Sequence, residues 1–183
     1  MLGSRPLTIK ELQILDMCFM WEHARVAFKI CLYSGLRPQE VLSLRVGDVV
    51  GVDRLLLSKR NSKGKLKSRS IKLHPDLISV LSHHSKGRPL DEALFLDKWD
   101  KPLKYHAWWR QFKTAVERAN LKGKVGLHSG RKTFAQHIYR SSDKDVVMVA
   151  HMLGHRNLRS TLDYLSFETV EGDRIVEQMP WAK

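Results

Sequence analysis

The sequence is poor in cysteine and in long apolar runs, and each shortage excludes a class of protein. Its 183 residues include only two cysteines, Cys18 and Cys31, which lie inside apolar helical patterns and form no Cys-x-x-Cys pair. Neither a zinc cluster nor a disulfide framework is therefore predicted. No stretch reaches the roughly 18 apolar residues of a membrane span, and the start, MLGSRPLT, lacks the apolar segment of a signal peptide. We expect a soluble, intracellular protein.

Acidic residues are also scarce, numbering 19 against 32 lysines and arginines, so the formal net charge is +13. Such an excess favours a polyanionic partner, because each basic side chain that neutralises a phosphate releases condensed counterions. A soluble protein that is merely basic is the alternative. The apolar fraction of 43% is ordinary and provides for a real hydrophobic core. The length fits one domain, or at most two small ones.

Helical signals dominate the chain. The sequence Thr8-Ile9-Lys10-Glu11 is a capping box and predicts a first helix. Gly35 is expected to end a helix over residues 22–34, and Pro38 to begin a short third helix. The same kinds of signal predict further helices over residues 75–84, 105–120, 129–140, 143–151, 159–165 and 169–178.

Three short runs are typical of strands instead, at residues 46–50, 54–58 and 69–73. Gly51 and the loop at residues 61–64 separate them, which predicts a small antiparallel three-stranded sheet. No repeat, low-complexity tract or linker divides the chain. The predicted fold class is therefore α+β, mostly helical, with a single domain over residues 1–183.

Two segments place arginines where anions bind in proteins. Arg37 lies between a glycine that ends one helix and a proline that begins the next, where free backbone amides favour an anion. His128 and Arg131 lie three residues apart at a helix start, so both can point to one place and hydrogen-bond a phosphate. The alternatives are a structural surface arginine at 37, a capping histidine at 128 and a solvated arginine at 131.

A third segment joins a histidine to a tyrosine. His155 follows Gly154, which is expected to hold it at a defined turn, and Tyr164 comes nine residues later on a predicted short helix. A tyrosine in such a place is usually a half-buried packing residue. The functional interpretation is a phenol nucleophile, which needs a base or cationic neighbours.

Taken together, these segments resemble one family. The order SGLRPQE, HSGR with KTFA, LGH, and then a tyrosine nine residues on is similar to the signature of tyrosine recombinases and phage integrases, from about Leu7 to Tyr164. The resemblance implies a tyrosine-recombinase catalytic-domain-like fold. It also implies site-specific cleavage and rejoining of DNA through a 3′-phosphotyrosine, with no metal, cofactor or ATP. The lack of a P-loop or a carboxylate cluster fits this activity.

Carried over to this sequence, the resemblance gives each motif residue a role. Arg37 and Arg131 would clamp the scissile phosphate and stabilise the charge of the transition state. His128 and His155 would hydrogen-bond that phosphate, with His128 the better candidate for general acid–base work. Tyr164 would attack the phosphorus.

The family also has a lysine in a β-hairpin turn, which protonates the 5′-oxygen leaving group. Lys63 aligns best with it. Other lysines of the same turn also qualify: Lys59, Lys65 and Lys67. The whole basic run over residues 59–69 is expected to reach toward DNA phosphates. Glu40 matches the family's Arg-x-x-Glu and would orient Arg37 or support the fold.

The resemblance further implies double-stranded DNA as the partner, a homo-tetramer on DNA with a monomer in solution, and no membrane partner. The expected location is the cytoplasm of a bacterium or a phage-infected host, associated with the nucleoid. Family members usually carry an N-terminal core-binding domain, so we expect this chain to be a fragment or a minimal recombinase. Two other functions compete: a type IB topoisomerase, which nicks one strand and works alone, and a non-catalytic DNA-binding relative.

Overall fold

The computed structural model describes residues 4–57, 69–155, 157–162 and 164–165. The elements follow in the order α1 (Ile9–Cys18), α2 (Glu22–Ser34), α3 (Pro38–Leu42), η1 (Val46–Asp48), β1 (Arg54–Leu57), β2 (Arg69–Lys72), α4 (Pro75–Ser85), α5 (Tyr105–Arg118), α6 (His128–Ser141), α7 (Val146–Leu153) and α8 (Leu158–Leu162). None of the helices described is both long and apolar enough to cross a membrane. The helix predicted over residues 169–178 lies outside the described residues.

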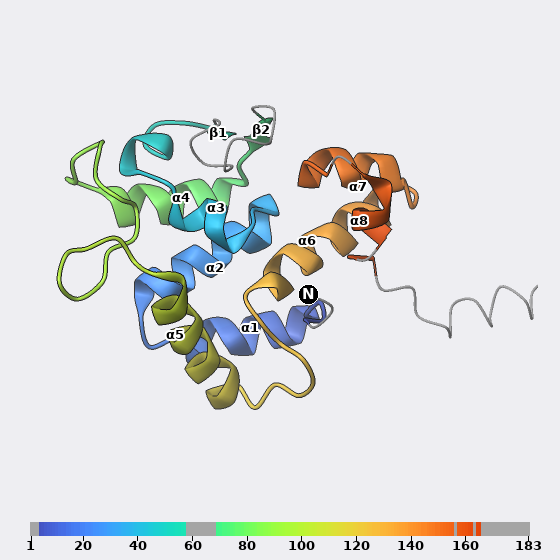
Figure 1. Ribbon diagram of the computed structural model, residues 1–183, viewed down its shortest axis with the longest axis horizontal. Helices are drawn as coiled ribbons and strands as arrows, with labels where there is room; N and C mark the ends of the chain where they lie inside the picture. Colours follow the sequence, from blue (N-terminus) through green and yellow to red (C-terminus); the bar gives the residue numbers. More distant parts are fainter. Residues whose placement is uncertain (1–3, 58–68, 156, 163, 166–183) are drawn as a thin grey trace, which may run out of the picture.

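Helix α2 is the centre of the larger core. Its buried residues lie on more than one face, so α6, α4, α3 and α5 can all pack around it (Figure 1). From α5, the fully buried Trp108 donates its indole N–H to the backbone oxygen of Ala24 at 3.2 Å. The helices predicted from the sequence are therefore folded around α2, which buries residues on more than one face.

The sheet is the element that the sequence predicted least well. Among the described residues it has two strands, β1 and β2, paired antiparallel with Arg54 opposite Lys72. The run at 46–50, predicted as a third strand, instead begins with the 3-10 turn η1. The amide of Arg45 donates to the Asp48 carboxylate at 2.8 Å, and such a local hydrogen bond competes with strand pairing.

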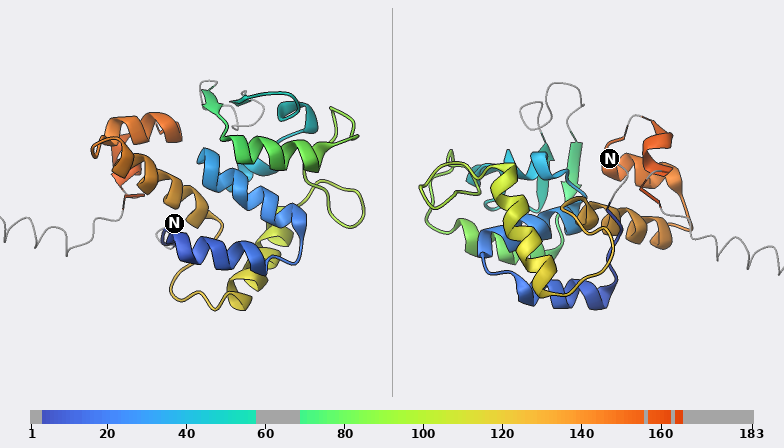
Figure 2. Two further views of the ribbon diagram at one scale, coloured as in Figure 1. Left: turned by 180° about the vertical axis from the view of Figure 1, so that it is seen from behind. Right: turned by 60° about the horizontal axis from the view of Figure 1, so that its bottom comes forward.

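A second, smaller core lies beyond the middle of α6. Its buried residues come from α6, α7 and the chain just after α8: Phe134, Ala135, Val149, Leu153 and Leu165. Figures 1 and 2 show α7 and α8 stacked on the far half of α6, to one side of the larger body. We call the part formed by α7, α8 and residues 164–165 the α7–α8 lobe. Residues that carry chemistry lie where this lobe meets the larger core.

Gly35 is the point of closest approach between the two parts. It ends α2 in the left-handed conformation, with φ 65°. A Cβ at this position would lie 2.5 Å from Cδ1 of Phe134 and 3.1 Å from Cδ2 of Leu153, both in the smaller core. Glycine is therefore required here both by the backbone conformation and by the contact.

This double requirement predicts a graded loss of stability. Gly35→Ala should lower the free energy of unfolding by the left-handed cost of about 1–2 kcal/mol, plus about 1–3 kcal/mol for the overlap. Gly51→Ala is the matched control, because Gly51 has φ 66° and nothing within 4 Å of a Cβ. Chemical denaturation of the three proteins measures the difference. Equal losses for the two variants would show that the smaller core does not press on Gly35.

Candidate active site

Arg37 and Glu40 form an ion pair at the start of α3. Arg37 is the N-cap residue and Pro38 occupies the first turn, which suits its fixed φ and missing N–H. The Glu40 carboxylate accepts the Arg37 backbone N–H at 2.7 Å and its guanidinium at 3.0 Å. Glu40 is 5% exposed and Arg37 33% exposed. As the resemblance implied, Glu40 orients Arg37, which leaves part of the guanidinium open to solvent.

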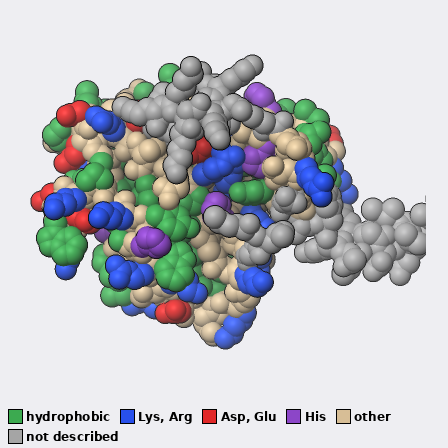
Figure 3. All heavy atoms as spheres, in the orientation of Figure 1, with side chains coloured by type: hydrophobic (Ala, Val, Ile, Leu, Met, Phe, Trp, Pro, Cys, Tyr) green, Lys and Arg blue, Asp and Glu red, His purple; other side chains and the backbone are tan. Residues whose placement is uncertain are grey.

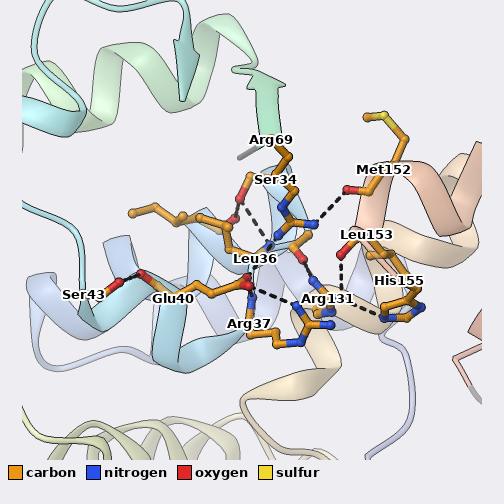
Figure 4. Close-up of polar contacts among 12 residues, drawn as sticks. Ser34, Leu36, Arg37, Glu40, Ser43, Arg69, Arg131, Met152, Leu153 and His155 are labelled. Carbon is orange, nitrogen blue, oxygen red and sulfur yellow. Dashed lines mark hydrogen bonds and ion pairs between the residues drawn. The ribbon is translucent and has the colours of Figure 1, made fainter. Parts of the chain in front are cut away.

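Arg131 lies in the first turn of α6 and is fully buried. Its guanidinium donates to the backbone oxygen of Gly35, to that of Leu153 at 3.0 Å and to Nε2 of His155 at 2.9 Å (Figure 4). Burial, reinforced by the charge of Arg37, lowers the pKa of Arg131 to about 10, so it stays charged at neutral pH. Among the described residues, its buried Nε has no hydrogen-bond partner. The described part of the fold therefore leaves the Nε–H of this cation unsatisfied.

His155 is held by both ring nitrogens. Nε2 faces the Arg131 guanidinium, which can only donate, so Nε2 is the acceptor. The proton of the neutral ring then lies on Nδ1, which donates to the hydroxyl of the buried Thr161 at 2.8 Å. Burial and the charges of Arg131 and Arg37 lower the pKa of His155 to about 3. The ring is therefore neutral and in one tautomer at neutral pH.

His128 is the first residue of α6, one turn before Arg131. Burial, followed by the charges of Arg131 and Arg37, lowers its pKa as well. A neutral imidazole in this positive field can accept a proton. In the space-filling view, blue Lys/Arg and purple His side chains gather where α3 meets the α7–α8 lobe (Figure 3).

Tyr164 is half-buried beside the same groups. Its ring lies edge-on to the His155 ring with 5.2 Å between centroids. The guanidinium carbon of Arg131 lies 5.4 Å from the ring centre, and Nζ of Lys132 lies 5.8 Å from it. The packing interpretation of this residue is therefore confirmed, because Tyr164 packs on the smaller core. The cationic neighbours that a phenol nucleophile needs are also present, and the nucleophilic role stays a prediction.

Five of the six site residues predicted from the sequence thus come together from α3, α6 and the α7–α8 lobe. The sixth, Lys63, and its alternatives Lys59, Lys65 and Lys67 lie outside the described residues. Of the basic run that is expected to reach toward DNA phosphates, only the last member, Arg69, lies within the described residues, and it turns toward the protein. Its side chain is 14% exposed and binds Glu40 at 3.0 Å. Within the described residues, no group of three or more His, Cys, Asp or Glu is placed to hold a metal ion.

Sequence reasoning did not single out Arg69 or Thr161. Arg69 was grouped with the charged turn that precedes it, although its place at the first residue of a strand is a signal that it can turn inward. Thr161 was treated only as part of a helix. Its buried hydroxyl, which fixes the His155 tautomer, depends on a contact that no spacing rule predicts.

Comparison with known proteins places this geometry in a family. Residues 10–169 match the model of the phage integrase family. Tyrosine recombinase XerH of Campylobacter jejuni is 29% identical over 147 residues, which cover 79% of this chain and 41% of the relative. Tyrosine recombinase XerD of Corynebacterium glutamicum is 29% identical over 147 residues, which cover 76% of this chain and 47% of the relative. The chain therefore spans less than half the length of these relatives.

Solved structures show the same fold. The crystal structure of XerA recombinase matches with a TM-score of 0.77 at 18% identity, over 96% of this chain and 65% of that chain. The catalytic domain of bacteriophage HP1 integrase matches with a TM-score of 0.65 at 22% identity, over 98% of both chains. The predicted recombinase-like catalytic fold, mostly helical with a small antiparallel sheet, is thereby confirmed, and in the part of the chain that the structure describes the sheet has two strands in place of three.

The buried neutral imidazole predicts a pH dependence of stability. The pKa of His155 falls from its ordinary 6.5 to about 3 on folding, so below pH 6.5 the unfolded chain binds a proton that the folded chain refuses. Stability should therefore be fully present above about pH 6.5 and decline as the pH falls toward 3. His128 and His84, whose pKa values burial also lowers, act in the same direction.

His155→Asn isolates the contribution of one ring. Chemical denaturation at a series of pH values should show that the free energy of unfolding declines less steeply between pH 6.5 and 3 for this variant than for the wild-type protein. His137→Asn is the control, because His137 is an exposed histidine of α6 and its removal should leave the decline intact. An unchanged slope in His155→Asn would mean that His155 is charged in the folded protein.

Proposed function

The chain belongs to the phage integrase family, and on this premise we propose that it is the catalytic domain of a tyrosine-type site-specific DNA recombinase. It cleaves and rejoins DNA strands through a 3′-phosphotyrosine intermediate. The observation that carries the proposal is the convergence of a tyrosine, two arginines and two histidines at the junction of two cores. A set chosen for packing alone does not need a buried guanidinium with an unused donor.

The two arginines bind the scissile phosphate in this proposal. Arg37 offers the solvent-facing part of its guanidinium, and Arg131 offers its charge and the Nη2 donor that now binds Nε2 of His155. Pre-organised positive charge at this point stabilises the extra negative charge of the pentacoordinate transition state. Because the two guanidiniums are held by carboxylate or carbonyl partners, their charges are in place before the reaction, and only the hydrogen bond from Arg131 to His155 has to change.

Tyr164 supplies the nucleophile. Its Oη forms a bond to phosphorus while the bond from phosphorus to the 5′-oxygen breaks. The phenolic proton passes to His128, which is neutral because burial and nearby cations lower its pKa. The departing 5′-oxygen takes a proton from Lys63, or from one of the other lysines of that turn. Attack by a 5′-hydroxyl on the phosphotyrosine reverses each step, and the phosphodiester energy is conserved.

His155 must change its partner when DNA binds. Its Nε2 now accepts a hydrogen bond from Arg131, so it cannot donate to a phosphate oxygen in the same tautomer. A phosphate anion beside the ring favours a proton on Nε2 and draws the Arg131 donor to itself. The ring then donates to the phosphate. Thr161 accommodates either state, since its hydroxyl can accept from Nδ1 or donate to it.

Double-stranded DNA is the proposed substrate, and two further facts support it. The net charge of +13 favours a polyanion. XerH has been solved in a post-cleavage complex with a palindromic difH substrate and matches this chain with a TM-score of 0.72 at 21% identity, over 94% of this chain and 52% of that chain. We propose a monomer in solution that assembles as a tetramer on DNA in the cytoplasm. Relaxation of supercoiled DNA without strand exchange would instead indicate the topoisomerase function.

Removing a single oxygen tests the nucleophile. Tyr164→Phe keeps the ring that packs beside His155 and Arg131, so folding and DNA binding should be unchanged. The covalent protein–DNA adduct on a nicked suicide substrate should disappear completely. Tyr139→Phe is the matched control, because Tyr139 packs on the same smaller core, and it should still form adduct. Adduct formed by Tyr164→Phe would assign the attack to another residue.

A sulfur substitution tests the general acid. An alkoxide needs a proton to leave, whereas a thiolate leaves without one, so a bridging 5′-sulfur should rescue only the variant that lacks the acid. The Lys63→Ala variant should cleave the oxygen substrate slowly and the sulfur substrate at nearly the rate of the wild-type protein. The comparison set replaces the other lysines of the turn: Lys59→Ala, Lys65→Ala and Lys67→Ala. Rescue confined to one of these would move the acid to that position, and rescue of none would place it outside the turn.

A further inference from the structure

We propose that Arg69 is a positioning residue, whose guanidinium fastens the α7–α8 lobe to the Glu40–Arg37 pair of the larger core. It holds Tyr164 and His155 in register with Arg37. This inference rests on the function proposed above and adds one residue to the same site.

The contacts of Arg69 span the two parts of the molecule. Arg69 begins β2 and turns inward (Figure 4). Its Nη2 donates to the Glu40 carboxylate at 3.0 Å, and its Nη1 donates to the backbone oxygen of Met152 at 3.2 Å. Glu40 belongs to α3 and Met152 to α7, so one planar group bridges the part that orients Arg37 and the part that carries Tyr164.

The end of α7 is built to receive this guanidinium. Gly154 ends α7 with φ 64°, and a Cβ there would lie 2.7 Å from Nη1 and 3.1 Å from Cδ of Arg69. Alanine would therefore overlap the side chain that bridges the lobe. The glycine that turns the chain toward His155 also leaves the space in which Arg69 lies.

Two consecutive carbonyls of α7 are bound by two arginines, the partly buried Arg69 and the fully buried Arg131. Arg69 binds the oxygen of Met152 and Arg131 binds that of Leu153. The last carbonyls of a helix lack intrahelical partners, and positive charge at this end is favourable. Arg131 reaches α7 from α6, on which the lobe already packs, whereas Arg69 reaches it from the sheet. Arg69 thus restrains the lobe from a second direction.

Arg69 also has an electrostatic signature. Its charge is one of those that hold the pKa of His155 below its ordinary value, after burial, Arg131 and Arg37. Removal of that charge should therefore raise the pKa of His155. A cation far from His155 would not shift this titration, so the shift reports that the Arg69 guanidinium lies beside the site in the folded protein.

The first experiment measures single-turnover adduct formation at saturating DNA, with DNA affinity measured separately. Arg69→Ala should slow adduct formation by about 100-fold, since a displacement of about 1 Å remote from the chemistry has an effect of this size. DNA affinity should change little. Arg69→Lys keeps the charge but lacks the fork that reaches both partners, so it should also be slow. Arg54→Ala is the control on the neighbouring strand, where the side chain is exposed, and its rate should be unchanged.

A double-mutant cycle tests the contact itself. Gly154→Ala alone should slow adduct formation as Arg69→Ala does. In the Arg69→Ala background, Gly154→Ala should slow adduct formation little beyond the effect of its backbone strain, because the Arg69 atoms that a Cβ would overlap are gone. Gly87→Ala, at a left-handed glycine with nothing within 4 Å, gives that backbone cost. NMR titration of His155 should show a raised pKa in Arg69→Ala and no change in Arg54→Ala.

Several results would overturn the proposal. An unchanged rate of adduct formation in Arg69→Ala would show that Arg69 is dispensable. An equal fall in rate and DNA affinity would show that Arg69 only contacts DNA. Additive effects of the Arg69 and Gly154 substitutions would deny the coupling. If the unchanged protein itself forms no adduct, the proposed function fails first. If it forms adduct and Arg69→Ala is equally fast, only the positioning role of Arg69 fails.

Discussion

The buried guanidinium of Arg131 is the interaction on which the rest of the site depends. An isolated charge without exposure to water costs several kcal/mol unless hydrogen bonds compensate it. The compensating partners are the carbonyls of Gly35 and Leu153 and the ring of His155. These partners come from the end of α2, the end of α7 and the turn after it. The hydrogen bonds of this one guanidinium therefore fix three chain segments against one another. The end of α2 belongs to the larger core, and the end of α7 belongs to the smaller one.

The same requirement sets the electrostatics of the site. After burial, the charge of Arg37 lowers the pKa values of Arg69 and Arg131, and the charge of Arg69 lowers that of Arg131. The Glu40 carboxylate binds both Arg37 and Arg69. Burial, together with the remaining positive potential, lowers the pKa of His155 and keeps the ring neutral. A phosphodiester bound among these groups would relieve the repulsion among the cations. Catalysis in this account comes mainly from charge arranged during folding, and the hydrogen bond between Arg131 and His155 is the contact that changes when DNA binds.

Local rules predicted most of the helices, because caps and turns are written in neighbouring residues. The capping box at Thr8 and the glycine stop at Gly35 lie where the sequence placed them. Helix α7 begins at Val146, later than expected, because the Asp145 carboxylate caps the amides of Val147 and Met148. The third strand was wrong because Asp48 closes a local turn. The inward course of Arg69 and the tautomer of His155 depend on long-range contacts, which spacing along the chain does not encode.

The central claim is that folding assembles these groups around one nucleophile, and mapping the covalent bond tests it most directly. The unchanged protein would be trapped on a nicked suicide substrate, digested, and analysed by mass spectrometry for the peptide that carries the nucleotide. The account predicts a single modified peptide with the 3′-phosphate on Tyr164, which lies 5.2 Å from the His155 ring between centroids. A nucleotide on any other residue, or the absence of a covalent adduct, would contradict it.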